Sequence, residues 1–341
     1  MTYGFGLIGC GAIAPVHAEA IAQLDNARLV AVCDVVEERA RALAARCGAD
    51  WCVDYHELLR RDDIHIVNIV TWSGLHAEIG IVAAGAGKHV ICTKPIDVTL
   101  DKIDRLIDAC RGAGVKLAAI HQFRNFPSFA RLKQAIDEER LGRIYLGNAF
   151  VPWHRAQAYY DSAEWRGTWR WDGGGALMNQ GIHYVDLIQW LVGPVAEVQA
   201  YTDTMAHQIE VEDAAVAALR YHNGALGLIM GSTAIYKGLP SRIEVYGATG
   251  NVAIEGEDIV RWHVAEQEVV GRFSGATLGA DDPRSGLSSA VGAHVEQIGD
   301  LLRAIEEDRE PVLSGEEARK AVAIVLAIYE SARTGRPVKP G

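Results

Sequence analysis

Residues 3–14 of the chain read YGFGLIGCGAIA, which joins a short apolar run to a glycine-rich turn. The motif Gly9-x-Gly11-x-x-Ala14 directly follows an expected strand, and a helix is predicted from Pro15 onward. Such glycines let backbone N–H groups approach a pyrophosphate at the positive end of the helix. The second expected strand ends at Asp34, 25 residues after Gly9, where a carboxylate can accept from an adenosine ribose hydroxyl. This stretch predicts a dinucleotide-binding Rossmann domain.

The residues around Asp34 favour NAD over NADP. Val35 and Val36 follow it rather than an arginine, and the Asp34 carboxylate would repel a 2′-phosphate. Arg39, further along the next expected helix, keeps NADP open as the less favoured alternative. From the motif alone, the residues expected to contact the cofactor are Gly9, Gly11, Ala12, Ile13 and Asp34.

The first 121 residues alternate short apolar runs with amphipathic stretches, which is typical of βα units with a parallel sheet. The expected strands are Tyr3–Ile8, Arg28–Asp34, Ile64–Val70, Lys88–Cys92 and Val115–Ile120. The helices expected between them are Pro15–Leu24, Val35–Arg46, Leu75–Ala86 and Leu100–Gly112.

After Gln122 the pattern changes to that of an α+β domain. Helices are predicted over Pro127–Glu139 and Gly181–Leu191, on either side of a Trp- and Gly-rich stretch at 150–178. Closely spaced strands follow, so a large, open, mainly antiparallel sheet is expected from Val195–Thr202, Ala214–Tyr221, Ala225–Thr233, Arg242–Tyr246, Asn251–Ile254 and Ile259–His263. Residues 271–290 are predicted to form a long loop.

Three parts are therefore expected in the chain. Residues 1–121 form the Rossmann domain, and residues 122–315 form a domain for substrate binding and oligomerisation. Residues 316–341 contain a last helix, which is expected to pack back on the Rossmann domain.

The composition argues against several classes of function. With 341 residues, 49% of them hydrophobic, the chain can bury more than one core, and its net charge of −11 disfavours a surface for nucleic acid. The first residues enter a strand without a leader, and the longest apolar run, 321–329, is too short for a membrane span, so a cytoplasmic protein is expected. Because the Cys and His residues lack metal-ligand spacing, no metal site is expected.

Three further segments match known proteins: Thr71-Trp72-Ser73-Gly74-Leu75-His76, Thr93-Lys94-Pro95, and GGGALMNQGIH at residues 173–183. Together with the glycine-rich turn, they resemble the glucose–fructose oxidoreductase / inositol dehydrogenase / MocA family over nearly the whole chain. The resemblance implies an N-terminal Rossmann domain, a C-terminal open sheet used for oligomerisation, and an active site between them. A homodimer or homotetramer is therefore expected.

The resemblance also implies roles for individual residues. A Glu-Lys-Pro motif of the family supplies a catalytic lysine, and an Asp four residues before a His completes the set. By position these roles fall on Lys94, His183 and Asn179. Cofactor contacts are expected from Thr71, Trp72, His76, Thr93, Lys94 and Gln122, with His76 packing around the cofactor rather than acting in catalysis.

Two positions depart from the family pattern. Thr93 stands where Glu is usual, so it can hydrogen-bond but cannot support the charge of Lys94 as a carboxylate would. Asn179 stands where Asp is frequent. An Asp there would raise the pKa of His183; with the amide, the imidazole stays neutral more easily and Asn179 can bind a substrate hydroxyl instead.

Oxidation of a secondary alcohol needs a hydride acceptor, a base for the proton and a group that stabilises the developing alkoxide. We expect Lys94 to polarise the C–O bond and His183 to take the proton. The family favours a cis bond at Lys94–Pro95. Because His183 follows Gly181 at the start of an expected helix, the helix dipole should lower its pKa, and Asp186 on the same face should orient it.

The Trp-rich stretch is predicted to form the substrate pocket, because sugar rings stack on aromatic faces and Arg side chains bind hydroxyl, carboxylate or phosphate groups. It contains Trp153, Trp165, Trp169, Trp171, Tyr159, Tyr160, Arg155, Arg166 and Arg170. Substrate contacts are expected from Arg124, His154, Tyr160, Trp165, Trp169, Asn179 and His183. The same aromatic residues would also suit a patch that covers the sheet or a subunit interface.

These observations predict an NAD-dependent dehydrogenase that oxidises a secondary hydroxyl of a sugar, sugar acid, sugar nucleotide or cyclitol. The alternative is a family member that holds NAD tightly for internal redox, as in aldose–aldose oxidoreduction or glycoside cleavage, or that binds NAD only as a sensor. Thr93 and Asn179 favour this alternative.

Overall fold

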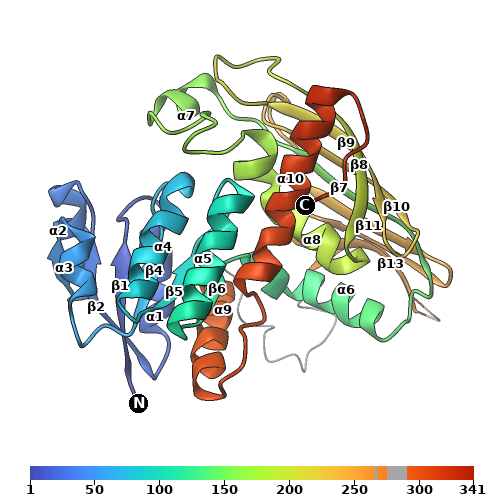
Figure 1. Ribbon diagram of the computed structural model, residues 1–341. Helices are drawn as coiled ribbons and strands as arrows, with labels where there is room; N and C mark the ends of the chain where they lie inside the picture. The colour runs from blue at the N-terminus through green and yellow to red at the C-terminus, as the bar shows by residue number, and fades with distance from the viewer. Residues whose placement is uncertain (265–266, 275–289) are drawn as a thin grey trace. The chain divides into compact units, whose positions relative to one another are not determined.

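The computed structural model describes residues 1–264, 267–274 and 290–341, and the chain divides into two compact units (Figure 1). Unit 1 contains Met1–Gln122 and Ser289–Arg319, and unit 2 contains Phe123–Ser288 and Lys320–Gly341. Most of the loop predicted at 271–290 lies outside the described residues. Its first residues, 271–274, belong to a strand instead.

Unit 1 is built on a parallel sheet of six strands in the order β3-β2-β1-β4-β5-β6. The strands are β1 (Tyr3–Ile8), β2 (Ala27–Cys33), β3 (Asp50–Cys52), β4 (Ile66–Ile69), β5 (His89–Cys92) and β6 (Leu117–Ala119). The strand order reverses direction between β1 and β4, and ligands of doubly wound sheets bind at the carboxyl ends of the strands at such a point. The Rossmann fold predicted from the sequence is confirmed.

The helices of unit 1 follow the predicted alternation with one addition. They are α1 (Ala14–Ala22), α2 (Glu37–Cys47), α3 (Tyr55–Leu59), α4 (His76–Gly85) and α5 (Leu100–Ala113). Neither β3 nor α3 was predicted, because elements of three and five residues are too short to show a hydrophobic period. The side chain of Asp54 starts α3 by accepting from the His56 N–H at 2.9 Å.

Helix α9 (Ala290–Glu306) packs on α1 and belongs to unit 1. Its residues Ile298, Leu301 and Leu302 recur at helical spacing and lie in the same core as β1 and β2. The sequence prediction counted this segment with the second domain. The buried apolar face of α9 is what joins it to the first unit.

Unit 2 is built on an eight-stranded sheet in the order β14-β13-β12-β11-β7-β10-β9-β8. Neighbouring strands pair antiparallel except β7 and β10, which run parallel, so the predicted mainly antiparallel sheet is confirmed. The strands are β7 (Ile144–Pro152), β8 (Val195–Asp203), β9 (Ala214–Tyr221), β10 (Leu226–Ser232), β11 (Arg242–Gly247), β12 (Gly250–Glu255), β13 (Asp258–Val264) and β14 (Gln267–Ser274).

Strand β7 lies inside this sheet, although the sequence analysis did not predict it. Gly147 and Asn148 interrupt its apolar run, which weakens the strand pattern. A Cβ on Gly147 would lie 2.4 Å from Cγ2 of Val192, so the glycine allows helix α8 (Ile182–Val192) to approach the sheet closely. Side chains that alternate with Gly147 point to the opposite face, where apolar residues are exposed: Leu146, Val216, Leu226 and Leu228.

The remaining helical elements of unit 2 are α6 (Pro127–Asp137), α7 (Gln157–Asp161) and a turn of π-helix, η3 (Ala176–Gly181), which runs into α8. Helix α10 (Gly315–Thr334) starts in unit 1 and continues in unit 2 from Lys320. In unit 1, Arg319 forms an ion pair with Asp104 of α5 at 2.6 Å. In unit 2, Ser331 accepts from the Ala200 N–H at 3.0 Å, so the end of α10 packs on β8.

Candidate active site

The turn after β1 has two glycines for two different reasons. Gly9 has a φ of +98°, and a Cβ there would lie 2.7 Å from the Val70 carbonyl oxygen, so the fold itself requires glycine. A Cβ built on Gly11 meets no described atom within 4 Å. The fold therefore leaves open space over Gly11, as a turn that receives a pyrophosphate must. Helix α1 begins just beyond, its N-terminus without a side-chain cap, and Ala12 and Ile13 are exposed.

Asp34 lies beside this turn, as predicted. Its two carboxylate oxygens accept from the backbone N–H groups of Cys10 at 2.7 Å and Val36 at 2.8 Å. The carboxylate thereby ties the end of β2 to the glycine-rich turn. Both features line a cavity of about 360 Å³, whose wall also includes Thr71, Trp72, Val36, Arg39, Val53 and Tyr55.

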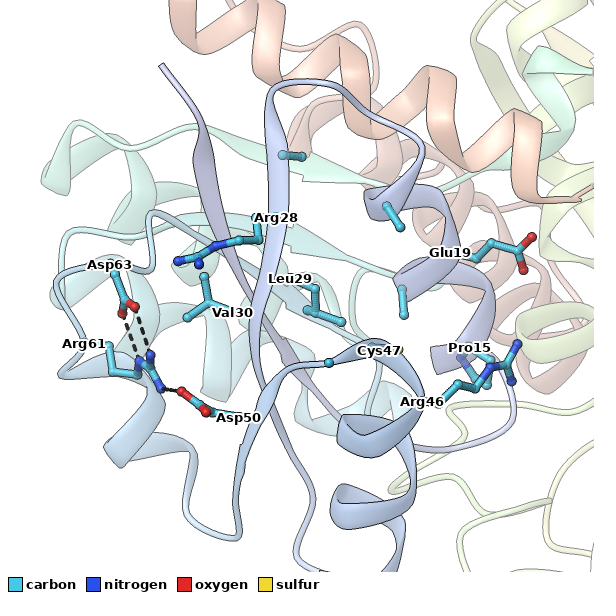
Figure 2. A pocket seen from close by; sticks show the side chains of 14 residues that line it. Pro15, Glu19, Arg28, Leu29, Val30, Arg46, Cys47, Asp50, Arg61 and Asp63 are labelled. Atoms are coloured by element: carbon cyan, nitrogen blue, oxygen red, sulfur yellow. Dashed lines mark hydrogen bonds and ion pairs between the residues drawn. The ribbon is translucent and has the colours of Figure 1, made fainter.

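A larger hollow in unit 1 is a separate feature. It has a volume of about 700 Å³ and is lined by the first residues of β2 together with α1 and the end of α2 (Figure 2). Arg61 closes one side by donating to Asp50 and Asp63 at 2.6 and 2.9 Å. Because this hollow lies toward the amino ends of the strands, it is not where a doubly wound sheet binds a dinucleotide.

His76 is buried and contacts the protein backbone through both ring nitrogens. Nδ1 lies 2.8 Å from the carbonyl oxygen of Pro95, and Nε2 lies 3.1 Å from that of Thr71. Burial lowers the pKa of His76. The ring therefore links the loop after β4 to the loop after β5. Its expected packing around the cofactor stays a prediction.

Lys94 follows β5 at the carboxyl edge of the sheet, and the predicted cis bond at Lys94–Pro95 is confirmed. Thr93 and Lys94 are half-buried, and Gln122 lies half-buried just after the last strand of the unit. Asp97, which the sequence analysis missed, fixes this loop. Its fully buried carboxylate accepts from Ala77 at 2.9 Å and from Val98 at 2.6 Å. An Asp two residues after a Lys-Pro pair was the only signal for it.

In unit 2, helix α8 (Ile182–Val192), which carries His183, agrees with the predicted helix Gly181–Leu191 to within one residue at each end. The π-turn η3, which carries Asn179, runs into α8, so the continuous helical stretch opens at Ala176. The first amides of the stretch point at Glu212, whose carboxylate accepts from Gly175 and Leu177 at 2.9 and 2.8 Å.

Glu212 is buried, and Tyr329 of α10 donates to it at 2.9 Å. Burial raises the pKa of the Glu212 carboxyl to about 7, although its hydrogen bonds, those from Leu177, Gly175 and Tyr329 among them, oppose that shift. A Cβ on Gly175 would lie 2.0 Å from the Glu212 carbonyl oxygen, so the segment before η3 fits tightly against this residue. Nothing in the local sequence pattern marked Glu212 as a partner.

His183 is buried and stacks on Phe123, with ring centroids 4.4 Å apart and an interplanar angle of 22°. Asp186, one turn later, forms two hydrogen bonds with the buried guanidinium of Arg124, at 2.7 and 2.5 Å. Arg124 also lies over the ring of Trp190. The structure thus uses Arg124, predicted to contact substrate, and Asp186, predicted to orient His183, in an internal ion pair.

Several aromatic residues of the Trp-rich segment are linked through two arginines: Arg155 lies over the rings of Trp153 and Tyr159, and Arg166 lies over those of Tyr159 and Trp165. The hydroxyl of Tyr160 hydrogen-bonds to Thr233 Oγ1 at 2.7 Å, and burial raises its pKa to about 12. His154 packs against Tyr236, whereas Trp169 is largely exposed and meets Tyr329 edge-on.

A polar network beside Asn179 joins three residues of the predicted pocket, Arg155, Tyr159 and Arg166, to Gln180, which was not predicted. Arg155 donates to Gln180 Oε1 from Nε and Nη2 at 3.1 and 2.8 Å, and Gln180 donates to the Tyr159 hydroxyl at 2.7 Å. Arg166 donates to the same hydroxyl. Neither guanidinium forms an ion pair with a carboxylate in the part of the chain that the structure describes. Among the described residues, the two guanidiniums therefore contact an amide, a hydroxyl and aromatic rings but no carboxylate within ion-pair distance.

Within residues 1–264, 267–274 and 290–341, no three Cys, His, Asp or Glu side chains come together as metal ligands do. The helices of these ranges also fall short of the length and apolarity that a membrane span requires.

Each of the two units matches the model of a known protein family. Residues 3–121 match the model of an oxidoreductase family with an NAD-binding Rossmann fold, and residues 129–253 match the GFO/IDH/MocA C-terminal domain. The chain is 27% identical to myo-inositol 2-dehydrogenase of Thermotoga maritima over 340 residues, which cover 98% of this chain and 97% of that protein.

Two solved structures are similar over the whole chain. The WlbA dehydrogenase of Bordetella pertussis, in complex with NADH and UDP-GlcNAcA, is 37% identical with a TM-score of 0.89, covering 99% of this chain and 97% of that one. The WlbA dehydrogenase of Chromobacterium violaceum, with the same ligands, is 35% identical with a TM-score of 0.89, covering 99% and 96%.

The open space over Gly11 gives a test of the cofactor site. We expect Gly11→Ala to leave the melting temperature of the cofactor-free protein unchanged, because the added methyl meets no described atom. Binding of NADH, followed by its fluorescence, should weaken about ten-fold or more because the methyl occupies the place of the pyrophosphate. Gly9→Ala is the contrasting variant and should lower the melting temperature itself. Unchanged NADH affinity in Gly11→Ala would contradict this assignment.

The raised pKa of Glu212 predicts a pH dependence of stability. Its folded pKa of about 7 lies above the ordinary 4.5, so its contribution is fully present below pH 4.5 and is lost as the pH rises through 7. The loss amounts to about 3 kcal/mol. We expect the free energy of unfolding to fall between pH 5 and 8 by about this much more in the wild type than in Glu212→Gln. Parallel curves for the two proteins would show that Glu212 does not titrate in this range.

Proposed function

The chain belongs to the GFO/IDH/MocA family of NAD-binding oxidoreductases, and on that premise we propose that it is an NAD-dependent dehydrogenase of an acidic sugar or sugar nucleotide. The observation that carries the substrate class is the pair of guanidiniums, Arg155 and Arg166, that lack a carboxylate partner among the described residues.

The residues of unit 1 fit NAD. The open space over Gly11 and the uncapped start of α1 suit a pyrophosphate, and the Asp34 carboxylate suits a ribose with a free 2′-hydroxyl. Among the described residues that line this cavity, Arg39 alone is basic, so support for a 2′-phosphate is small. When bound, the nicotinamide supplies the hydride acceptor.

We assign the proton chemistry to one residue from each unit. Lys94, held at the edge of the parallel sheet by the loop that His76 and Asp97 fix, donates to the substrate oxygen and stabilises its developing negative charge. The imidazole of His183 takes the hydroxyl proton at a ring nitrogen. Stacking on Phe123 holds the ring plane, which limits the orientations that the base can adopt.

The substrate class follows from charge. A carboxylate or diphosphate is the natural counter-charge for two Arg side chains, because guanidinium groups bind both through paired hydrogen bonds. Arg155 contacts Gln180, the residue next to Asn179, so the charged end of a sugar bound there would lie close to the proposed chemistry. The ligand of the WlbA structures, UDP-GlcNAcA, carries both kinds of anionic group.

The decisive experiment supplies NAD and compares UDP-GlcNAcA with UDP-GlcNAc, which keeps the diphosphate but lacks the sugar carboxylate, and with uncharged myo-inositol, while NADH absorbance is followed. We expect steady NADH formation, with kcat/KM for the acidic sugar nucleotide at least about ten-fold above the others. Faster oxidation of myo-inositol would overturn the substrate class. Protein that carries NAD from purification and releases no NADH with any substrate would point to internal redox.

Variants separate binding from chemistry in the same assay. His183→Ala should lower kcat by roughly 10²- to 10⁴-fold while NADH affinity stays unchanged, because the imidazole acts on the proton. The exposed His222 provides a control, and His222→Ala should keep full activity. Arg166→Gln should raise KM for the acidic substrate alone. Equal turnover in His183→Ala and the wild type would refute the assigned base.

We also propose that the open face of the unit 2 sheet pairs with a second copy of the chain. Leu146, Val216, Leu226 and Leu228 form its exposed apolar surface across three neighbouring strands. Light scattering should give the mass of a dimer or tetramer, and Leu228→Lys should shift it toward the monomer because a buried charge is costly. Leu239→Lys, at an exposed position outside these strands, is the control. A wild-type monomer would contradict the proposal.

A further inference from the structure

Asn179 faces a buried carboxylate. Its Nδ2 donates to Asp172 Oδ1 at 2.6 Å, and the other oxygen of Asp172 accepts from the Gly167 N–H at 2.9 Å. Asp172 is 1% exposed, whereas Asn179 is half-buried. The two residues lie on either side of the Gly173–Gly175 turn, so the contact also closes the segment that leads into η3.

The charge of Asp172 fixes which way the amide of Asn179 points. An ionised carboxylate only accepts hydrogen bonds, so the amide nitrogen must turn toward Asp172 and the carbonyl oxygen, Oδ1, must turn away. An oxygen in that position accepts from a hydroxyl group but cannot donate to one. The orientation therefore selects the kind of group that Asn179 can bind.

The same contact explains why residue 179 is an amide. An Asp at this place would put two carboxylates in direct contact, and two such groups cannot both be ionised in a buried site. One of them would have to keep a proton. With Asn179, the single negative charge stays on Asp172 and the neighbouring residue remains neutral at every working pH.

We infer that Asp172 is a positioning residue of the active site, which orients Asn179 so that its Oδ1 accepts a hydrogen bond from a substrate hydroxyl. This inference rests on the proposed dehydrogenase function. Asp172 acts through Asn179 and does not contact the reacting atoms. The carboxylate at position 172 and the amide at position 179 therefore work only as a pair.

The titratable groups that interact with Asp172 or with its neighbours include Tyr160, Tyr329 and Glu212. Its charge raises the pKa values of Tyr160 in α7 and Tyr329 in α10, both of which burial raises more. Glu212 acts on the same two phenols and has a pKa of about 7. Experiments in the Glu212→Gln background therefore remove the nearest competing titration.

The first test exchanges the two side chains. Asn179→Asp should lower kcat/KM about 100-fold at pH 8 and recover as the pH falls, because a proton shared with Asp172 removes the repulsion between two facing carboxylates. Asp172→Asn should raise KM, because the amide at 179 loses its fixed orientation. The double exchange Asp172→Asn/Asn179→Asp should recover kcat/KM to within about ten-fold of the wild type, since one carboxylate again faces one amide. A double variant no better than Asn179→Asp would overturn the inference.

The second test needs no activity, so it stands even if the proposed function fails. In Asn179→Asp the shared proton raises the folded pKa of the pair. Stability should therefore fall, relative to the wild type, as the pH rises from 4 to 8, with a difference in melting temperature of roughly 5 °C or more. The double exchange should remove that difference. Asn251→Asp adds the same charge on β12 and is the matched control, with no such pH dependence expected. A pH-independent difference between Asn179→Asp and the wild type would overturn the inference.

Discussion

The parallel pairing of β1 with β2 on one side and β4 on the other is the constraint on which the chemistry of unit 1 depends. The sheet hydrogen bonds continue past the strand ends: Gly9 N–H donates to the Cys33 carbonyl at 2.8 Å, and Thr93 N–H donates to that of Ile69 at 3.0 Å. Loops that are far apart in the sequence therefore leave the sheet at one edge. The glycine-rich turn, Asp34 and Lys94 owe their common edge to this pairing.

Unit 2 positions its candidate site residues in a different way. In an antiparallel sheet the carboxyl ends of the strands alternate between the two edges, so the loops after the strands do not all leave at one edge. Here the buried carboxylate of Glu212 takes the first amides of a helical stretch, and a π-turn follows before α8 begins. The start of that stretch at Ala176 determines where Asn179 and His183 lie. The Gly173–Gly175 run is required because backbone and side chain approach closely there: a Cβ on Gly174 would lie 2.1 Å from the Tyr329 hydroxyl.

The sequence predicted the Rossmann half almost completely, because its strands are buried apolar runs separated by helices with a clear period. It predicted the regions of the candidate site through short motifs around Gly11, Lys94 and His183. The missing parts share one physical cause. Strand β7 is interrupted by a glycine that serves helix packing, and the partners of Arg124 and Asn179 are set by tertiary contacts that leave no local period. A charged residue in the sequence does not reveal whether its partner is a ligand or another side chain.

Whether a side chain pairs with a ligand or with the protein matters most for the acidic residues. In the structure, four of them pair with the protein backbone. Asp34, Asp97, Asp172 and Glu212 each accept hydrogen bonds from backbone N–H groups, and each thereby fixes a loop of its unit. Bonds of this kind stabilise a carboxylate where burial would otherwise penalise it. The net charge of −11 therefore does not describe the ligand sites, because these acids are engaged internally. Open space lies over Gly11 of the glycine-rich turn in unit 1, and unit 2 holds two guanidiniums that pair with no described carboxylate, so both proposed anion sites lie apart from these acids.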